Sequence, residues 1–367
     1  MTPLRGGCTR SRVTLVLGLF LLGLLCAPAW ALDLSDGLLR LTLYERTGRF
    51  SLSYLAKGRS GIPVSLLSAQ DPRTSTLSIV VGNKIYRMGE TSEFSQTVEK
   101  SARGGRFVWK SSFLQVTETF TFISSPESSV TSGVQIDIGL KNVSEKSFNA
   151  GIRLLFDTYL GEASFVHFRT DVLSQVSREL SLAPADKTMY WVSPLSGDPE
   201  DIGFQVMTSG TGVTVPDKVV FANWKRLSDV SWSYETSADR NFSQLPYSVN
   251  DSAVSQYYDP RAIPPGTEVT ITLVLGKFAR EGFRAAGPAS AQSFAASVEQ
   301  SLAAAKTNGD DGDAVRADLS TVNRVLVEID AALAAAATVP DDKLGVMESA
   351  LTELGGRSSR FAGAEGR

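Results

Sequence analysis

The stretch VQIDIGLKNVSEKSFNAGIRLLF, residues 134–156, decides the predicted fold. Apolar residues alternate with other residues over 134–140, which is the period of a strand with one buried face. A polar turn follows at 142–146, and the chain returns over 148–156. The second half of the return is apolar on both faces, which suits a central strand covered on each side. The stretch therefore predicts two strands of a β-sandwich joined by a turn.

The same alternation recurs from residue 38 to about residue 277, with no convincing helical periodicity over that length. It is clear at 39–43, 50–54, 114–122 and 269–275. One apolar and one mostly polar face is typical of antiparallel sheets. About a dozen or more strands are more than one small sandwich uses. We therefore predict a mainly β fold, a large antiparallel sandwich or two tandem ones, in a domain spanning residues 32–283.

Residues 284–356 are rich in alanine and predict two to three helices. Apolar residues recur at helical spacing over 294–302 and again over 344–354. Between them, a heptad-like stripe runs from Val315 to Leu333. This stripe favours a coiled-coil assembly with a partner, but a self-contained three-helix bundle uses the same pattern, so both alternatives stay open. We expect a flexible tail at 357–367.

Residues 1–31 have the three parts of a cleavable signal peptide. Three arginines form a basic start, residues 13–25 are an apolar run, and Ala29-Trp30-Ala31 supplies the small residues that a signal peptidase reads. The apolar run is shorter than the ~20 residues of a spanning helix, so we expect cleavage. The working protein would begin near Leu32 and be exported to the periplasm or the extracellular space.

Loss of the signal peptide changes the chemistry of the chain. Both cysteines, Cys8 and Cys26, lie within it, so the exported chain can form no disulfide and no thiolate metal site. Loss of three arginines takes the formal net charge from −3 to about −6. This charge argues against a nucleic-acid partner, which needs a basic patch. No second apolar run reaches spanning length, so we expect no membrane span after cleavage.

Catalytic motifs are scarce. His167 is the single histidine, which leaves little room for a Ser-His triad or a zinc hydrolase. The sequence has no G-x-S-x-G, P-loop or G-x-G-x-x-G motif. Residues 308–319 fail as a calcium loop, because Gly312 and Leu319 stand where ligands are needed. We therefore predict no catalytic residue, no cofactor and no metal.

Acidic residues near the predicted strand ends leave one enzymatic alternative open. A glycosidase needs only two carboxyl groups at a set separation, which a sequence cannot measure. The candidates are Asp157, Glu162, Asp217, Asp229, Asp251 and Asp259.

An aromatic cluster is the strongest local feature. Aromatic faces beside Asn and Asp can form a platform for sugar rings. The residues that we predict to contact a ligand are Asn223, Trp224, Trp232, Tyr234 and Asp251. Core packing is the alternative, because large sandwiches bury Trp routinely.

Four segments resemble parts of large exported bacterial β-sandwich proteins. They are Asn142–Thr158, Val220–Trp224, Asn250–Val254 and the Pro264-Pro265-Gly266 turn. The chain thus resembles proteins with supersandwich, galactose-mutarotase-like or carbohydrate-binding domains. This resemblance implies the fold of about residues 38–277. It does not carry over mutarotase activity, which would need paired catalytic histidines.

These observations predict an exported, non-enzymatic binding or scaffold protein with a β-sandwich domain and a helical interaction tail. The partner would be a glycan or a protein. The alternatives are a carbohydrate-binding module and a carboxylate-dependent glycan-active enzyme.

Overall fold

A computed structural model describes residues 31–55, 63–68, 72–101, 103–128, 130–162, 164–285 and 341–362, together with 318, 321, 322 and 325. The predicted signal peptide lies outside the described residues, except that Ala31 begins the first strand. The helix predicted over 294–302 and most of the stripe from Val315 to Leu333 also lie outside them. Assembly through that stripe stays a prediction.

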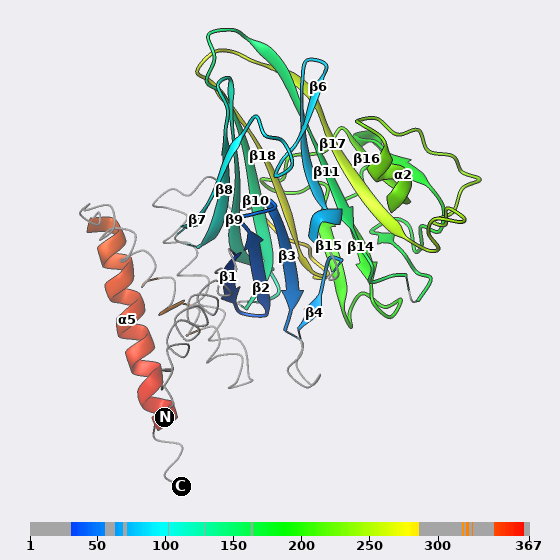
Figure 1. Cartoon of the computed structure of the whole chain (residues 1–367). Coiled ribbons are helices and arrows are strands. Elements are labelled where there is room, and N and C mark those ends of the chain that lie inside the picture. The colour runs from blue at the N-terminus through cyan, green and yellow to red at the C-terminus, as the bar shows by residue number, and fades with distance from the viewer. Residues whose placement is uncertain are drawn as a thin grey trace, which may run out of the picture.

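The larger sheet is antiparallel throughout and has eight strands (Figure 1). Its order is β12 (Arg169–Thr170), β14 (Tyr190–Pro194), β15 (Gly203–Met207), β18 (Glu268–Lys277), β10 (Thr131–Asn142), β9 (Leu114–Ser124), β8 (Gly104–Lys110) and β7 (Ser95–Ser101). The central strand β10 pairs with β9 and β18, with Val134 opposite both Phe122 and Leu275.

The smaller of the two main sheets has six strands. Its order is β13 (Leu180–Leu182), β16 (Lys218–Asn223), β17 (Ser252–Ile263), β11 (Phe148–Asp157), β5 (Thr76–Val81) and β6 (Lys84–Arg87). Residues 150–157 of β11 are all buried, which confirms the prediction of a strand covered on both faces. The chain passes from one main sheet to the other between β10 and β11. Asn142 fixes this turn, because its amide donates to the Lys146 and Ile263 carbonyl oxygens at 2.8 Å each.

A third sheet of four strands completes the domain. It consists of β1 (Ala31–Asp36), β2 (Leu39–Tyr44), β3 (Arg49–Tyr54) and β4 (Val64–Ser65). Leu39, Leu41 and Leu43 of β2 are fully buried in the core that both main sheets share. The alternation of the sequence thus marks the buried face correctly, and the predicted class, a mainly β sandwich followed by a helical segment, is confirmed.

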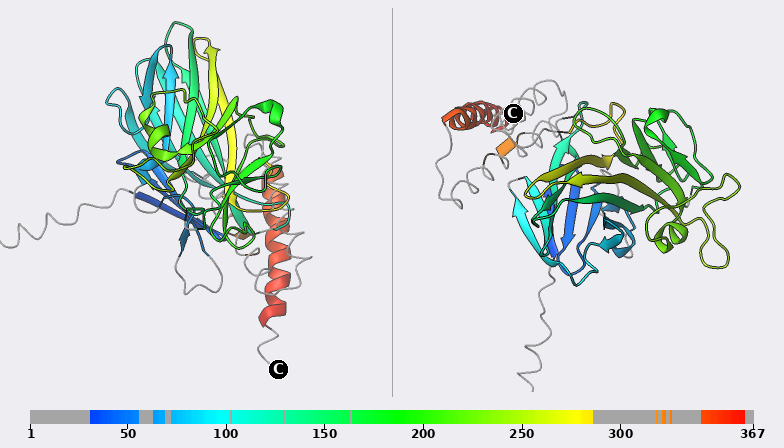
Figure 2. Two further views of the ribbon diagram at one scale, coloured as in Figure 1. Left: turned by 90° about the vertical axis from the view of Figure 1, so that its right-hand side faces the viewer. Right: turned by 90° about the horizontal axis from the view of Figure 1, so that it is seen from above.

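Two α-helices have defined bounds in the described part of the chain. The short α2 (Trp224–Asp229) interrupts the strand-rich region, and Asn223 caps it by accepting a hydrogen bond from the Arg226 N–H. The long α5 (Asp341–Ala362) lies alongside the β domain (Figures 1 and 2). Among the described residues, no helix is long and apolar enough to cross a membrane.

The helix α5 continues to Ala362, past residue 357, where the sequence predicts the start of a flexible tail. Arg357 explains the extension, because its guanidinium pairs with Glu353 one turn earlier and with Asp318. Of the four apolar residues that predict the helix, Met347 and Leu354 are buried. Leu344 and Leu351 are exposed.

Candidate functional site

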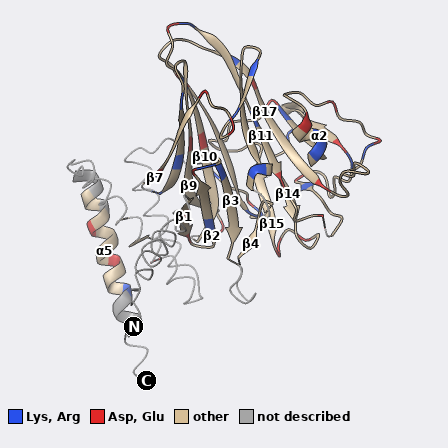
Figure 3. Ribbon diagram, viewed as in Figure 1, with Lys and Arg blue, Asp and Glu red and all other residues tan. Residues whose placement is uncertain are grey.

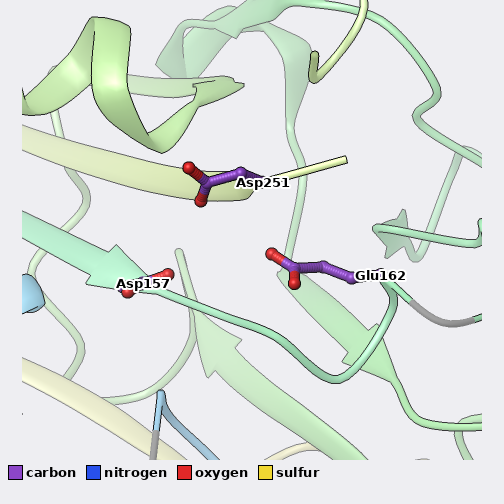
Figure 4. Close-up of side chains that lie close together, drawn as sticks. All are labelled: Asp157, Glu162 and Asp251. Atoms are coloured by element: carbon purple, nitrogen blue, oxygen red, sulfur yellow. The ribbon is translucent and has the colours of Figure 1, made fainter. Parts of the chain in front are cut away.

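Three of the acidic residues considered from the sequence meet at one end of the smaller main sheet. Asp157 is the last residue of β11, Asp251 directly precedes β17, and Glu162 lies in the loop after β11. The strands β11 and β17 are paired neighbours, with Asp157 opposite Ala253. One carboxylate oxygen of each acid lies within 4.8 Å of the other two, and Figure 4 shows the groups converging. We call these three residues the carboxyl site.

Local hydrogen bonds hold each acid in place. The Asp157 N–H donates to the Ser75 hydroxyl at 3.0 Å. The Ser252 N–H donates to Glu162 Oε1 at 3.1 Å, which ties the loop of Glu162 to the start of β17. Asp251 is fixed through its backbone, since its N–H donates to the Phe242 carbonyl at 3.1 Å. The geometry is therefore set by the strand pair and not by mobile side chains alone.

Burial and like charges raise the pKa values at the carboxyl site. The pKa of Glu162 rises to about 7, first because burial disfavours the carboxylate, and further because Asp251 and Asp157 are negatively charged. The Ser252 N–H works in the opposite direction. Burial also raises the pKa of Asp251. Near neutral pH, Glu162 is thus a carboxyl group that can give or take a proton.

This arrangement has three chemical uses. Carboxylate oxygens accept charge-assisted hydrogen bonds from the hydroxyl groups of a polar ligand. A protonated Glu162 beside an ionised Asp can act as a general acid. Oxygens spaced within 4.8 Å also match ligands on opposite sides of a Ca²⁺ ion, whose bonds to oxygen are ~2.3–2.6 Å.

The other three candidate acids lie elsewhere. Asp217 accepts a hydrogen bond from the Asp259 N–H at 2.7 Å and pairs with Arg261. Asp229 pairs with Lys225 on the surface of α2. The structure therefore divides the six acids into one cluster of three and three residues on the surface or in surface pairs.

Of the five residues predicted to contact a ligand, Asp251 lies in the carboxyl site and Asn223 directly beside it. The Asn223 side chain is fully buried. Its amide donates to the Phe242 and Asp251 carbonyl oxygens at 2.8 and 2.9 Å. Asn223 thus positions Asp251 in addition to capping α2.

The three aromatic residues of that prediction pack around α2. Trp224 is half-buried, and its indole N–H donates to the Thr74 carbonyl at 3.0 Å. Trp232 is half-buried and packs edge-on against Tyr257, with ring centroids 6.0 Å apart. Tyr234 is buried, and its hydroxyl donates to Glu179 at 2.7 Å. A ligand contact for these residues stays a prediction, and their observed contacts are structural.

Two more exposed aromatic residues lie close in sequence to acids of the carboxyl site, and the sequence pattern did not single them out. Phe165 follows Glu162 by three positions and is 63% exposed. Tyr247 precedes Asp251 by four positions and is 73% exposed. Phe165 also has a positive φ of 58°, which is uncommon for a bulky side chain.

His167 is buried near these loops. Its ring lies 4.7 Å from that of Phe242, centroid to centroid. Burial lowers its pKa to about 4, so the imidazole is neutral at neutral pH. The neutral ring thus packs against an aromatic side chain of the core.

Comparison with known protein families and with curated proteins finds no match for this sequence. Among solved structures, the chain is similar to a galactose mutarotase related enzyme from Lactobacillus acidophilus, with a TM-score of 0.43 and 9% identity over 70% of this chain and 100% of that one. It is also similar to a galactose mutarotase-like protein from Lactobacillus casei, with a TM-score of 0.41 and 10% identity over 67% and 99%.

Proposed function

We propose that the chain is an exported binding protein whose β-sandwich holds a hydroxyl-rich ligand of the carbohydrate class at the carboxyl site. The observation that carries this proposal is the convergence of Asp157, Glu162 and Asp251 within 4.8 Å where the two central strands of one sheet meet their loops. The signal peptide predicted at residues 1–31 supports export.

The chemistry of the surrounding loops supports this ligand class. Carboxylates accept short, charge-assisted hydrogen bonds from hydroxyl groups. Phe165 and Tyr247 are exposed and lie three and four positions from Glu162 and Asp251 in the sequence, and aromatic faces pack against the apolar faces of sugar rings. A ligand with many hydroxyl groups and some apolar surface uses both features.

The test is a glycan array followed by titration calorimetry with any saccharide that binds. We expect Glu162→Gln to weaken binding about tenfold or more, because a charged acceptor is lost. The matched control is Asp259→Asn, which removes an exposed carboxyl group further along β17 and should leave the affinity within about twofold. The proposal fails if no saccharide binds, or if Glu162→Gln binds as tightly as the unaltered protein.

A glycan-active enzyme is the second candidate, and the raised pKa of Glu162 favours it. A general acid must hold a proton at working pH, and a pKa of about 7 meets that need. Oxygens within 4.8 Å fit the close carboxyl pair of a retaining glycosidase, ~5–5.5 Å apart, better than the wider inverting pair. Asp157 or Asp251 would then be the second carboxylate.

Nitrophenyl glycosides test this candidate directly. If it is correct, hydrolysis should decline as the pH rises through about 7. Glu162→Gln should abolish it while Asp259→Asn does not. Binding of a saccharide without cleavage of any glycoside would reject the enzyme and leave the binding function in place.

A further inference from the structure

Three large apolar side chains are exposed together on the loop that leads into β17. Leu245 is 77% exposed, Tyr247 is 73% exposed and Val249 is 66% exposed. Single exposed apolar residues are common on protein surfaces, but a group of them marks contact with a partner or a membrane. Because burial of apolar surface is favourable, a surface that covers these side chains gains free energy. We call residues 243–250 the apolar loop.

Backbone hydrogen bonds close the tip of the apolar loop. The Gln244 N–H donates to the Ser248 carbonyl at 2.8 Å, and the Ser248 N–H donates back to the Gln244 carbonyl at 2.9 Å. The Tyr247 N–H also donates to the Gln244 carbonyl, at 2.8 Å. Pro246 has no N–H to satisfy. These groups at the tip therefore need no water as a partner, which is what an apolar medium requires of a backbone that enters it.

Polar side chains fix the base of the apolar loop to the rest of the domain. The Asn223 amide, at the start of α2, donates to the Ser248 hydroxyl at 2.9 Å. The Asn250 N–H donates to the Ser243 hydroxyl at 3.0 Å. The loop thus holds its apolar side chains in water on a support that is already formed. A pre-formed loop loses little conformational freedom when these side chains are buried.

The charges around the apolar loop favour an uncharged surface. Residues 243–250 contain no Lys, Arg, Asp or Glu, so burial of this segment removes no charge from water. Asp239 and Arg240 precede the segment and Asp251 follows it. This mixture of signs is not the cluster of basic residues that recognises anionic lipids. Tyr247 suits the boundary between lipid and water, where tyrosine is enriched in membrane proteins.

The size of the exposed group favours a lipid layer over a protein partner. Even a large aromatic side chain buries only ~150–250 Å², so the three side chains together present about 500 Å² or less. A standard protein interface buries ~800 Å² on each partner. Binding to a lipid layer instead grows with the apolar area that is inserted, so a small group is sufficient to contribute.

We propose that the apolar loop docks the protein on an uncharged lipid surface, with Leu245, Tyr247 and Val249 inserted at the boundary between the headgroups and the acyl chains. The contact is peripheral, because only the tip of one loop enters the lipid. Leu245 and Val249 take no part in the carbohydrate proposal, so the two proposals can fail separately.

The experiment is flotation of the full chain with vesicles of pure phosphatidylcholine. We expect the chain to float with the vesicles, and Leu245→Ser to lower its partition coefficient about tenfold, because the lipid then buries less apolar surface. The matched control is Val143→Ser, which alters a 45% exposed valine before the start of β11, whereas Asp157 and the carboxyl site lie at the end of that strand. It should change partition by less than about twofold. Raising the salt concentration from ~0.1 to ~1 M should not release the chain, because no charge of the loop takes part.

A second measurement distinguishes the apolar loop from any other lipid contact, including one made by an uncleaved apolar run at residues 13–25. Val249→Trp places an indole in the loop, and vesicles of brominated phosphatidylcholine quench an indole that enters the lipid. Quenching should increase over that of the unaltered chain in Val249→Trp and not in Val143→Trp.

Four outcomes would overturn the proposal. They are a chain that does not float, Leu245→Ser that floats as well as the unaltered chain, Val249→Trp without added quenching, and binding that requires anionic lipid. Loss of self-association in Leu245→Ser without vesicles would likewise assign the loop to a second copy of the chain and overturn the lipid contact. Because both loop positions are exposed, we expect urea denaturation to show unchanged stability in these variants.

Discussion

Two regions beside α2 bury acidic groups in opposite ways. Glu179 is fully buried, and it accepts from the Arg226 guanidinium at 2.7 Å, the Tyr234 hydroxyl at 2.7 Å and the Ser237 N–H at 3.0 Å. Both signs of charge occur together around α2 in Figure 3. In the carboxyl site, by contrast, burial raises the pKa of Glu162, and the charges of Asp251 and Asp157 raise it further. The two regions differ in the sign of the neighbouring charges: buried Glu179 meets the Arg226 guanidinium, whereas half-buried Glu162 meets two other acids.

This difference distinguishes a structural role from a functional role for the same type of side chain. A buried carboxylate with several donors ties loops to the sheets, and its removal leaves the donors unpaired. A group of carboxyls that repel one another costs free energy in the folded state, and a proton or a ligand can relieve that cost. The comparison predicts that substitutions in the two regions change stability in opposite directions.

The largest expected effect is at Glu179. Glu179→Ala removes an acceptor from Arg226 and Tyr234 and should lower the free energy of unfolding by about 3–5 kcal/mol. Urea denaturation measures the change. Lys225→Ala is the matched control, because it breaks the exposed pair with Asp229 on α2 and should cost about 0.5 kcal/mol or less. If Glu179→Ala costs no more than Lys225→Ala, the structural role given to Glu179 is wrong.

Glu118 in the core is an intermediate case between Glu179 and Glu162. It is buried, and its charged neighbour is the Arg49 guanidinium. Burial raises its pKa to about 8, although the nearby Arg49 guanidinium works in the opposite direction. Between its ordinary pKa of 4.5 and about 8, the unfolded chain releases this proton and the folded chain keeps it. The contribution of Glu118 to stability therefore falls as the pH rises through this window, by up to about 1.4 kcal/mol per pH unit.

The test is Glu118→Gln, which keeps the size of the side chain and cannot titrate. Its free energy of unfolding, compared with that of the unaltered chain at pH 5, 6.5 and 8, should show an advantage that grows with pH. Taking the difference between the two chains removes the contributions of Glu162 and His167, which titrate in both. A difference that is constant over this range would contradict the raised pKa of Glu118.

Much of the fold could be predicted from the sequence because the period of two marks the buried face of each strand. Even Glu118 follows the pattern, since it occupies the buried position between Val116 and Phe120. The period does not state which strands pair. The turn at Asn142 therefore predicts a return strand, but not that β11 lies in the opposite sheet.

The carboxyl site shows the same limit. Asp157 and Glu162 are close in sequence, but Asp251 joins them only because β11 pairs with β17. The residue types in the sequence give six candidate acids, and these three are among them. Only the pairing of β11 with β17 shows which three of the six meet. Asn223 shows a related limit. It caps α2, but this helix of six residues is too short to give a helical period in the sequence, so the aromatic residues around Asn223 suggested a ligand contact instead.

The smallest expected effect is at Asp251, and it tests the repulsion within the carboxyl site. Asp251→Asn keeps the shape of the side chain and removes one negative charge near Glu162. The pKa of Glu162 should fall from about 7, by less than about one unit, because burial is the larger cause of its shift and remains. A carboxyl NMR titration of Glu162 measures this change, with Asp259→Asn as the control that should leave the pKa of Glu162 unaltered.

Because the carboxylate of Glu162 meets less repulsion in Asp251→Asn, this variant should also be slightly more stable at neutral pH. The sign of this change in stability is opposite to that of Glu179→Ala. If the pKa of Glu162 stays the same or rises, the acids of the carboxyl site do not repel one another. The contrast between the carboxyl site and Glu179 would then be wrong.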